Sequence, residues 1–109
     1  MNNTDFISVY FMGEKDLALM SFNLFEQDIH ENFPKLDLYF SNASCLEYAK
    51  LLHKWKPNFK MFGNPQLSEK VSDLEKELKD NLEMLNLERH EFLKTQITMG
   101  IKQIKQNII

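Results

Sequence analysis

The fold is decided by residues 65–108, PQLSEKVSDLEKELKDNLEMLNLERHEFLKTQITMGIKQIKQNI. Apolar residues recur there every three or four positions, which is the spacing of one side of an α-helix, and Asn64-Pro65 supplies a start signal. No proline interrupts the run after Pro65, and only Gly100 weakens it. The pattern predicts one long C-terminal helix over residues 64–109.

A straight helix of this length would reach roughly 60 Å, which exceeds the diameter of a small domain. We therefore expect its distal half to leave the globule and to bury its apolar stripe against a second copy, as in a coiled coil. The predicted homodimer contacts are Leu82, Leu85, Leu93, Ile97, Ile101, Ile104 and Ile108. Two alternatives remain open, namely a reversal of the chain near Asn86 and a groove on another protein.

The preceding residues favour a small antiparallel sheet. Residues 6–12 and 17–25 alternate in apolar character around a polar turn with a glycine, which is typical of a hairpin, and residues 35–40 repeat the alternation. The polar stretch 26–34 between them is predicted to be a loop. A short helix follows from Cys45 and is expected to end at Lys56-Pro57. The predicted fold class is thus α+β, with about three strands and one short helix in a domain of residues 1–63, followed by the long helix of residues 64–109.

Charge is unevenly distributed along the 109 residues, whose formal net charge is −3. Residues 1–49 carry eight acids and two lysines, residues 50–60 carry four lysines and no acid, and residues 61–109 carry eight acids and seven bases. An acidic surface of this kind steers a protein toward a basic partner. The predicted contacts with that partner are Glu14, Asp16, Glu26, Asp28 and Glu31.

The resulting hypothesis is a non-enzymatic protein-interaction module. A small acidic protein of this size resembles, in size and charge alone, inhibitors of the anti-defence or immunity type, which occupy the basic surface of a nuclease or similar partner. The richness in Asn, Lys, Ile and Phe is typical of an AT-rich phage or bacterial source. The sequence therefore predicts an inhibitor of a basic protein.

The alternative hypothesis is a nucleic-acid-binding regulator, based on the stretch KLLHKWKPNFKMF at residues 50–62. Lysines interleaved with aromatic residues suit phosphates and unstacked bases. The residues concerned are Lys50, Lys54, Lys56 and Lys60. Trp55 and Phe62 are nevertheless expected to be core residues, and lysines near the end of a helix also complement its dipole.

Catalytic and metal-binding motifs are not evident in the sequence. The three histidines do not stand in a metal-ligand spacing, the glycines at 13, 63 and 100 cannot form a phosphate-binding loop, and Cys45 is the single cysteine. We therefore expect neither an enzyme nor a bound cofactor. The N-terminal residues lack the form of a signal peptide, and no apolar run is long enough to cross a bilayer, so a cytoplasmic location without membrane contact is predicted.

Overall fold

The computed structural model describes residues 5–80 and 85–108, and these residues form five helices without a strand. The helices are α1 (Asp5–Phe11), α2 (Lys15–Ser41), α3 (Cys45–Met61), α4 (Pro65–Asp80) and α5 (Leu87–Ile108). The predicted α+β fold is therefore wrong, and the chain is a helical bundle.

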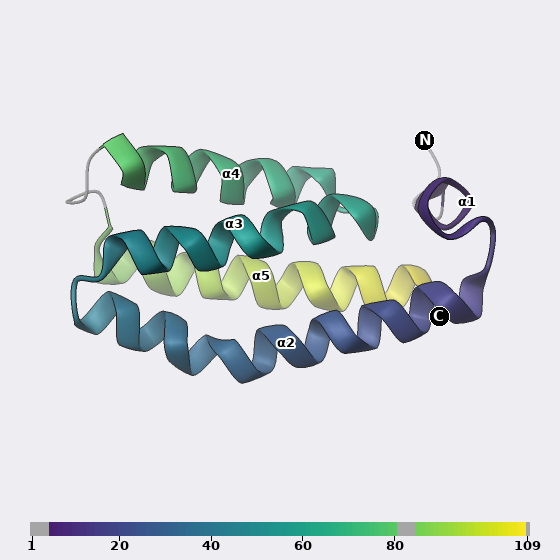
Figure 1. Cartoon of the computed structure of the whole chain (residues 1–109), viewed down its shortest axis with the longest axis horizontal. Helices are drawn as coiled ribbons and strands as arrows, with labels where there is room; N and C mark the ends of the chain where they lie inside the picture. The colour runs from purple at the N-terminus through teal and green to yellow at the C-terminus, as the bar shows by residue number, and fades with distance from the viewer. Residues whose placement is uncertain (1–4, 81–84, 109) are drawn as a thin grey trace.

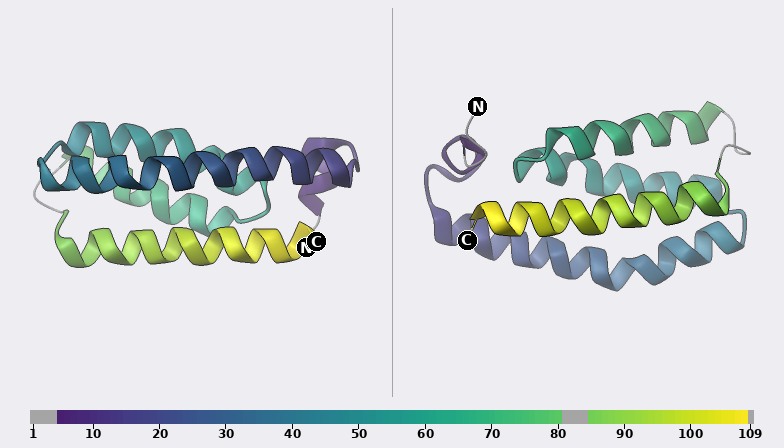
Figure 2. Two further views of the ribbon diagram at one scale, coloured as in Figure 1. Left: turned by 90° about the horizontal axis from the view of Figure 1, so that it is seen from below. Right: turned by 180° about the vertical axis from the view of Figure 1, so that it is seen from behind.

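Helices α2 to α5 lie side by side and alternate in direction, so that the chain runs up and down the long axis of the bundle (Figures 1 and 2). Consecutive antiparallel helices joined by short connections are the simplest topology of a four-helix bundle. Helix α1 lies across one end of this bundle (Figure 1). The whole arrangement measures 43 × 25 × 19 Å.

The three predicted strands are helical. Residues 6–12 overlap α1, whereas residues 17–25, 26–34 and 35–40 all belong to α2. The buried side chains of α2 recur at helical spacing and are Ala18, Phe22, Phe25, Ile29 and Leu36. The alternation in residues 17–25 was misleading because apolar residues occupy both sides of the helix there, which satisfies a period of two as well as one of 3.6.

Two prolines that were interpreted as boundaries lie inside helices. Pro34 is in α2 and Pro57 is in α3. A proline in a helix removes one backbone hydrogen bond and costs about 3 kcal/mol, and α2 is bent accordingly (Figure 1). Both helices continue because their buried stripes extend past the proline, to Leu36 in α2 and to Phe59 in α3, and packing outweighs the local cost.

The predicted long C-terminal helix is also wrong, because it is divided into α4 and α5. Asn86 caps the start of α5: its side-chain Oδ1 accepts a hydrogen bond of 2.9 Å from the backbone N–H of Arg89. α5 then runs back along the bundle in the direction opposite to α4 (Figure 1). A reversal of the chain near Asn86 is therefore what the structure shows.

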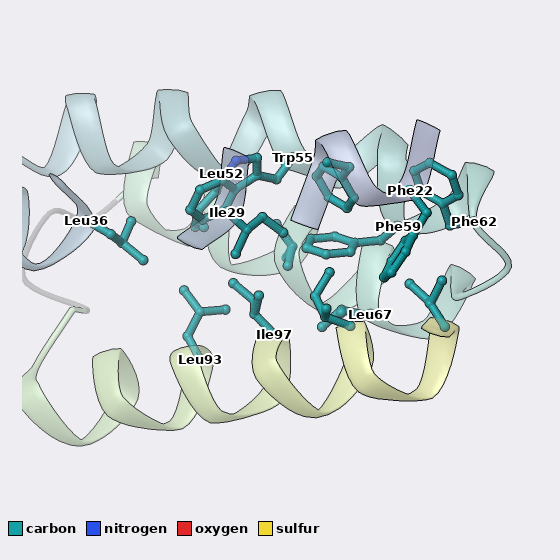
Figure 3. Close-up of a cluster of buried hydrophobic side chains, with 14 of the residues drawn as sticks. Phe22, Ile29, Leu36, Leu52, Trp55, Phe59, Phe62, Leu67, Leu93 and Ile97 are labelled. Atoms are coloured by element: carbon teal, nitrogen blue, oxygen red, sulfur yellow. The ribbon is translucent and has the colours of Figure 1, made fainter. Parts of the chain in front are cut away.

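The core is one continuous cluster with contributions from all five helices. Figure 3 shows part of it, with side chains from α2, α3, α4 and α5. At the end covered by α1, the ring of Phe62 stacks on Phe11 and Phe25 with ring centroids 5.7 Å apart in both pairs. Phe6 and Phe22 meet the same ring edge-on. The core thus draws on residues from both sides of the predicted domain boundary at residue 63.

Candidate functional site

The residues that were predicted to form a dimer contact lie mostly within the core. Leu93, Ile97, Ile101, Ile104 and Ile108 are buried, and Leu85 is partly buried against them. Leu82 lies outside the described residues. Figure 3 shows Leu93 and Ile97 pointing from α5 toward the other helices. Because this stripe is covered within one chain, it no longer supports pairing with a second copy.

The lysines of the basic stretch are largely engaged in ion pairs. Lys50 contacts Glu47 at 3.2 Å, Lys54 contacts Asp28 at 3.4 Å and Lys56 contacts Glu75 at 2.9 Å. Lys60 is exposed. The neighbouring aromatic residues Trp55, Phe59 and Phe62 are fully buried and cannot stack on a base. The structure therefore does not bring lysines and aromatic rings together on one surface, and the nucleic-acid hypothesis loses its main support.

Glu75 is a nearly buried carboxylate, 2% exposed, that joins α4 to α3. It contacts His53 Nδ1 at 2.8 Å, Lys56 Nζ at 2.9 Å and Lys79 Nζ at 3.0 Å. Burial raises the pKa of the Glu75 carboxyl, but the hydrogen bonds from Lys56, Lys79 and His53 outweigh this effect and lower the pKa to about 2. Glu75 is thus a charged link between two helices: two lysines compensate its charge, and His53 adds a hydrogen-bond contact.

A second polar cluster joins α2, α3 and α5. His90 lies between two partners: its Nδ1 is 2.8 Å from the Tyr48 hydroxyl, and its Nε2 is 2.7 Å from Asp37 Oδ1. Lys94 donates to both oxygens of Asp37, at 2.9 and 3.1 Å, and the ring of Phe40 stacks on the imidazole. Burial, with the nearby Asp37 charge, raises the pKa of Tyr48. For Asp37, hydrogen bonds from Lys94 and His90 outweigh the effect of burial and lower the pKa.

Tyr48, His90 and Asp37 have the order of a proton relay, but their surroundings favour a structural role. Tyr48 is fully buried and His90 is 1% exposed. Only Asp37 is open to solvent, with its side chain 46% exposed, and none of the five cavities described for residues 5–80 and 85–108 is lined by Tyr48, His90 or Asp37. General acid–base catalysis needs the group within hydrogen-bond reach of a substrate. We therefore assign this cluster to helix packing.

Residues 5–80 and 85–108 contain no group of three or more histidine, cysteine, aspartate or glutamate side chains arranged to hold a metal ion. This part of the chain also contains no helix with the length and apolar character required to span a bilayer.

The five acidic residues of the predicted partner surface divide into two groups. Asp28 is structural, because its carboxylate accepts the Trp55 Nε1–H at 3.1 Å, and Glu26 lies 3.7 Å from Lys105. The other three are on the exposed surface: Glu14, Asp16 and Glu31. The structure therefore brings only part of the predicted acidic set to a surface where a partner could contact it.

Between these exposed acids lies a surface that the sequence reading missed. Leu17, Met20 and Leu24 are 45, 60 and 65% exposed, respectively. Their spacing of three and four residues places them together on the side of α2 that faces away from the core. We call these three residues the outer stripe of α2. The sequence does contain a sign of this surface. In residues 17–25, LALMSFNLF, apolar residues are too many to fit on the core-facing side of one helix.

A groove between α4 and α5 holds two adjoining cavities. One cavity of about 500 Å³ and a second of about 320 Å³ share Leu67, Lys70 and Gln96 in their walls. The larger one is rich in amide side chains, contributed by Asn64, Gln66, Gln96, Gln103 and Asn107. The smaller one is more apolar and reaches Phe92. These amides are uncharged and do not by themselves indicate a particular ligand.

Comparison with protein-family models, with curated proteins and with solved structures finds no match for this chain.

Proposed function

We propose that the protein is a non-enzymatic interaction module that binds a basic protein partner through the outer stripe of α2 and the acidic residues beside it. One observation carries this proposal: the exposed large apolar side chains are concentrated in one part of the molecule. Of eleven such side chains in the described residues, six lie between residues 9 and 24, namely Val9, Tyr10, Met12, Leu17, Met20 and Leu24. Clusters of exposed apolar residues on a small protein mark surfaces where partners bind.

The geometry of the outer stripe suits a helical partner. Leu17, Met20 and Leu24 follow the i, i+3, i+7 spacing by which one helix presents apolar anchors to another. Ala18, Phe22 and Phe25, on the opposite side of α2, fix the helix to the core. The stripe is therefore held on a rigid element, which lowers the entropic cost of binding.

Charge beside the stripe favours a cationic partner. Residues 14–31 contain five acids and a single lysine, Lys15. Glu14 and Asp16 precede the stripe, and Glu31 follows it. Two copies of this surface would place acid against acid, so self-association here is disfavoured. The partner that fits is an amphipathic helix with apolar anchors in its middle and lysine or arginine at both ends.

The proposed consequence of binding is inhibition. Nucleases and other proteins that act on nucleic acids carry basic surfaces where the substrate phosphates bind. An acidic protein docked on such a surface competes with the substrate. Size and charge support this part of the proposal by analogy, and the target is defined here only by its basic, amphipathic chemistry.

The experiment is a fluorescence anisotropy titration with defined probes. The first probe is a lysine-flanked amphipathic helical peptide with leucines at i, i+3 and i+7, and the second has the same composition in scrambled order. A single-stranded RNA is the third probe and represents the alternative function. We expect binding of the first peptide only, with affinity that falls in high salt because the ends of the contact are charged.

Matched charge reversals locate the surface. E14K/E31K should weaken binding of the first peptide about tenfold or more, whereas E69K/D73K, on exposed positions of α4, should leave it unchanged. M20A/L24A tests the apolar part in the same way. Binding that both charge variants retain, or tight binding of the RNA alone, would contradict the proposal. Affinity capture from host lysate, with and without nuclease treatment, would then identify the natural partner.

A further inference from the structure

A second exposed apolar surface lies on α5, on the side turned away from the core. Phe92 and Met99 are both 61% exposed. They are seven residues apart, which is two helical turns, and the exposed Thr95 lies between them. Seen from behind, α5 lies toward the viewer in front of the bundle (Figure 2, right). We call Phe92, Thr95 and Met99 the outer stripe of α5.

This surface differs from the outer stripe of α2 in its charges. Along α5, the exposed acids Glu88 and Glu91 lie beside the start of the stripe, and the exposed Lys102 lies beside its end. Helical spacing of 100° per residue places Glu91 and Lys102 on the same flank of the stripe, the flank toward α2. Among residues 5–80 and 85–108, neither Glu91 nor Lys102 has an ion-pair partner.

Acids at one end and a base at the other make this surface complementary to itself when two copies meet in antiparallel orientation. In a two-fold symmetric contact, each interaction occurs twice. With the two-fold axis near Gln96, Phe92 of one copy packs on the turn from Met99 to Lys102 of the other. Glu91 then lies opposite Lys102, and the symmetry provides the same pair a second time. In a parallel two-fold arrangement the flanks that carry Glu91 and Lys102 would lie on opposite sides of the interface, so neither Glu91–Lys102 pair could form.

We infer that two copies of this chain associate through the outer stripes of α5, packed antiparallel, with reciprocal Glu91–Lys102 ion pairs. This contact is distinct from the one predicted from the sequence, because it uses the exposed side of α5 and leaves the buried stripe of Leu93 and Ile97 in the core. The interface is small, with two apolar anchors per copy, so we expect a dissociation constant on the order of micromolar or weaker.

Charge swapping tests this geometry directly. Sedimentation equilibrium of the wild-type protein should show a concentration-dependent dimer. E91K alone and K102E alone should each weaken the dimer about tenfold, because both symmetric contacts become repulsive. An equimolar mixture of the two variants should form a heterodimer of near wild-type affinity, since lysine at position 91 then faces glutamate at position 102 and the reverse contact is native. The double variant E91K/K102E should also dimerise.

Controls separate this contact from loss of folding and from the proposed function. K76E reverses an exposed charge on α4 and should leave dimerisation unchanged, and L38A removes an exposed leucine of α2 as a match for F92A and M99A. F92A/M99A should give a monomer whose helical content and unfolding midpoint remain near those of the wild type. A wild-type protein that stays monomeric at all concentrations would overturn the inference, and so would a dimer insensitive to the swaps. The peptide titration on α2 is independent of either outcome.

Discussion

His90 Nε2 lies 2.7 Å from Asp37 Oδ1 although 53 residues separate the two in the sequence, so one imidazole ties α5 to α2. The other nitrogen of the same ring is 2.8 Å from the Tyr48 hydroxyl and ties α5 to α3. A buried residue that satisfies polar groups on two other helices favours one relative placement of the three, because sliding any helix would leave a buried polar group without a partner.

Replacement of His90 should therefore destabilise the bundle more than an ordinary surface change. We expect H90L to lower the free energy of unfolding by about 3 kcal/mol, because the Tyr48 hydroxyl is left buried without its partner. Urea denaturation monitored by circular dichroism measures this change. H30L, at an exposed histidine of α2, is the matched control and should change stability by no more than about 0.5 kcal/mol.

The double variant H90L/Y48F distinguishes this network from simple packing. Removing the hydroxyl removes the unsatisfied group, so the double variant should lose less stability than the sum of the two single variants. Strict additivity, or an H90L protein as stable as H30L, would show that the contacts of His90 contribute little.

Glu75 predicts how stability depends on pH. Its pKa in the folded protein is lowered from 4.5 to about 2, so the folded state retains the charged form to lower pH than the unfolded chain does. The stabilisation is present above pH 4.5 and is lost as pH falls from about 4.5 toward about 2. We expect this group to account for about 2 kcal/mol of the acid-induced loss.

The matched pair E75Q and E69Q isolates this effect. Both residues are on α4, but Glu69 is exposed, whereas Glu75 contacts three cationic or titratable side chains. Denaturant titrations at several pH values should show a flatter acid limb for E75Q and a wild-type curve for E69Q. Equal acid limbs for E75Q and the wild type would assign the loss to other groups.

Part of the fold could be predicted from the sequence because it depends on local signals. The starts of α3 at Cys45 and of α4 at Pro65 were predicted correctly. Asn64 caps α4 by accepting the Leu67 N–H at 3.2 Å, whereas Ser44 makes no side-chain capping bond to α3. Trp55 and Phe62 are buried as expected. The apolar stripe of residues 93–108 was identified correctly, but its cover was assigned to another chain, because periodicity shows that a side is buried without showing what buries it.

The remainder depends on tertiary contacts that no local pattern contains. Residues 17–25 satisfy both periods, and the choice of helix is made by packing against Phe59 and Phe62, about 40 positions later in the chain. The role of Asp28 as the acceptor for the buried Trp55 indole was missed for the same reason, since this contact joins residues 27 positions apart. The outer stripes of α2 and α5 can be recognised only once it is known which side of each helix faces the core.

α5 approaches the start of α4 closely at Gly100. The effect of G100A on stability should therefore depend on the residue at position 67. Gly100 is buried, and a Cβ atom at this position would lie 2.4 Å from Leu67 Cδ2 and 3.2 Å from Asn64 Nδ2. G100A gains about 1 kcal/mol of helix propensity but forces the buried Leu67 side chain to move, at a cost of about 1–3 kcal/mol.

We expect G100A to destabilise the wild-type protein by about 1 kcal/mol in urea denaturation. In an L67A background the Leu67 contact is removed and only the looser 3.2 Å contact with Asn64 Nδ2 remains, so the same substitution should stabilise by up to about 0.5–1 kcal/mol. The matched control is S72A on α4, whose effect should be the same in both backgrounds because Ser72 does not line the contact. A G100A effect of the same sign and size with Leu67 and with Ala at position 67 would show that the two helices are not in contact at this glycine.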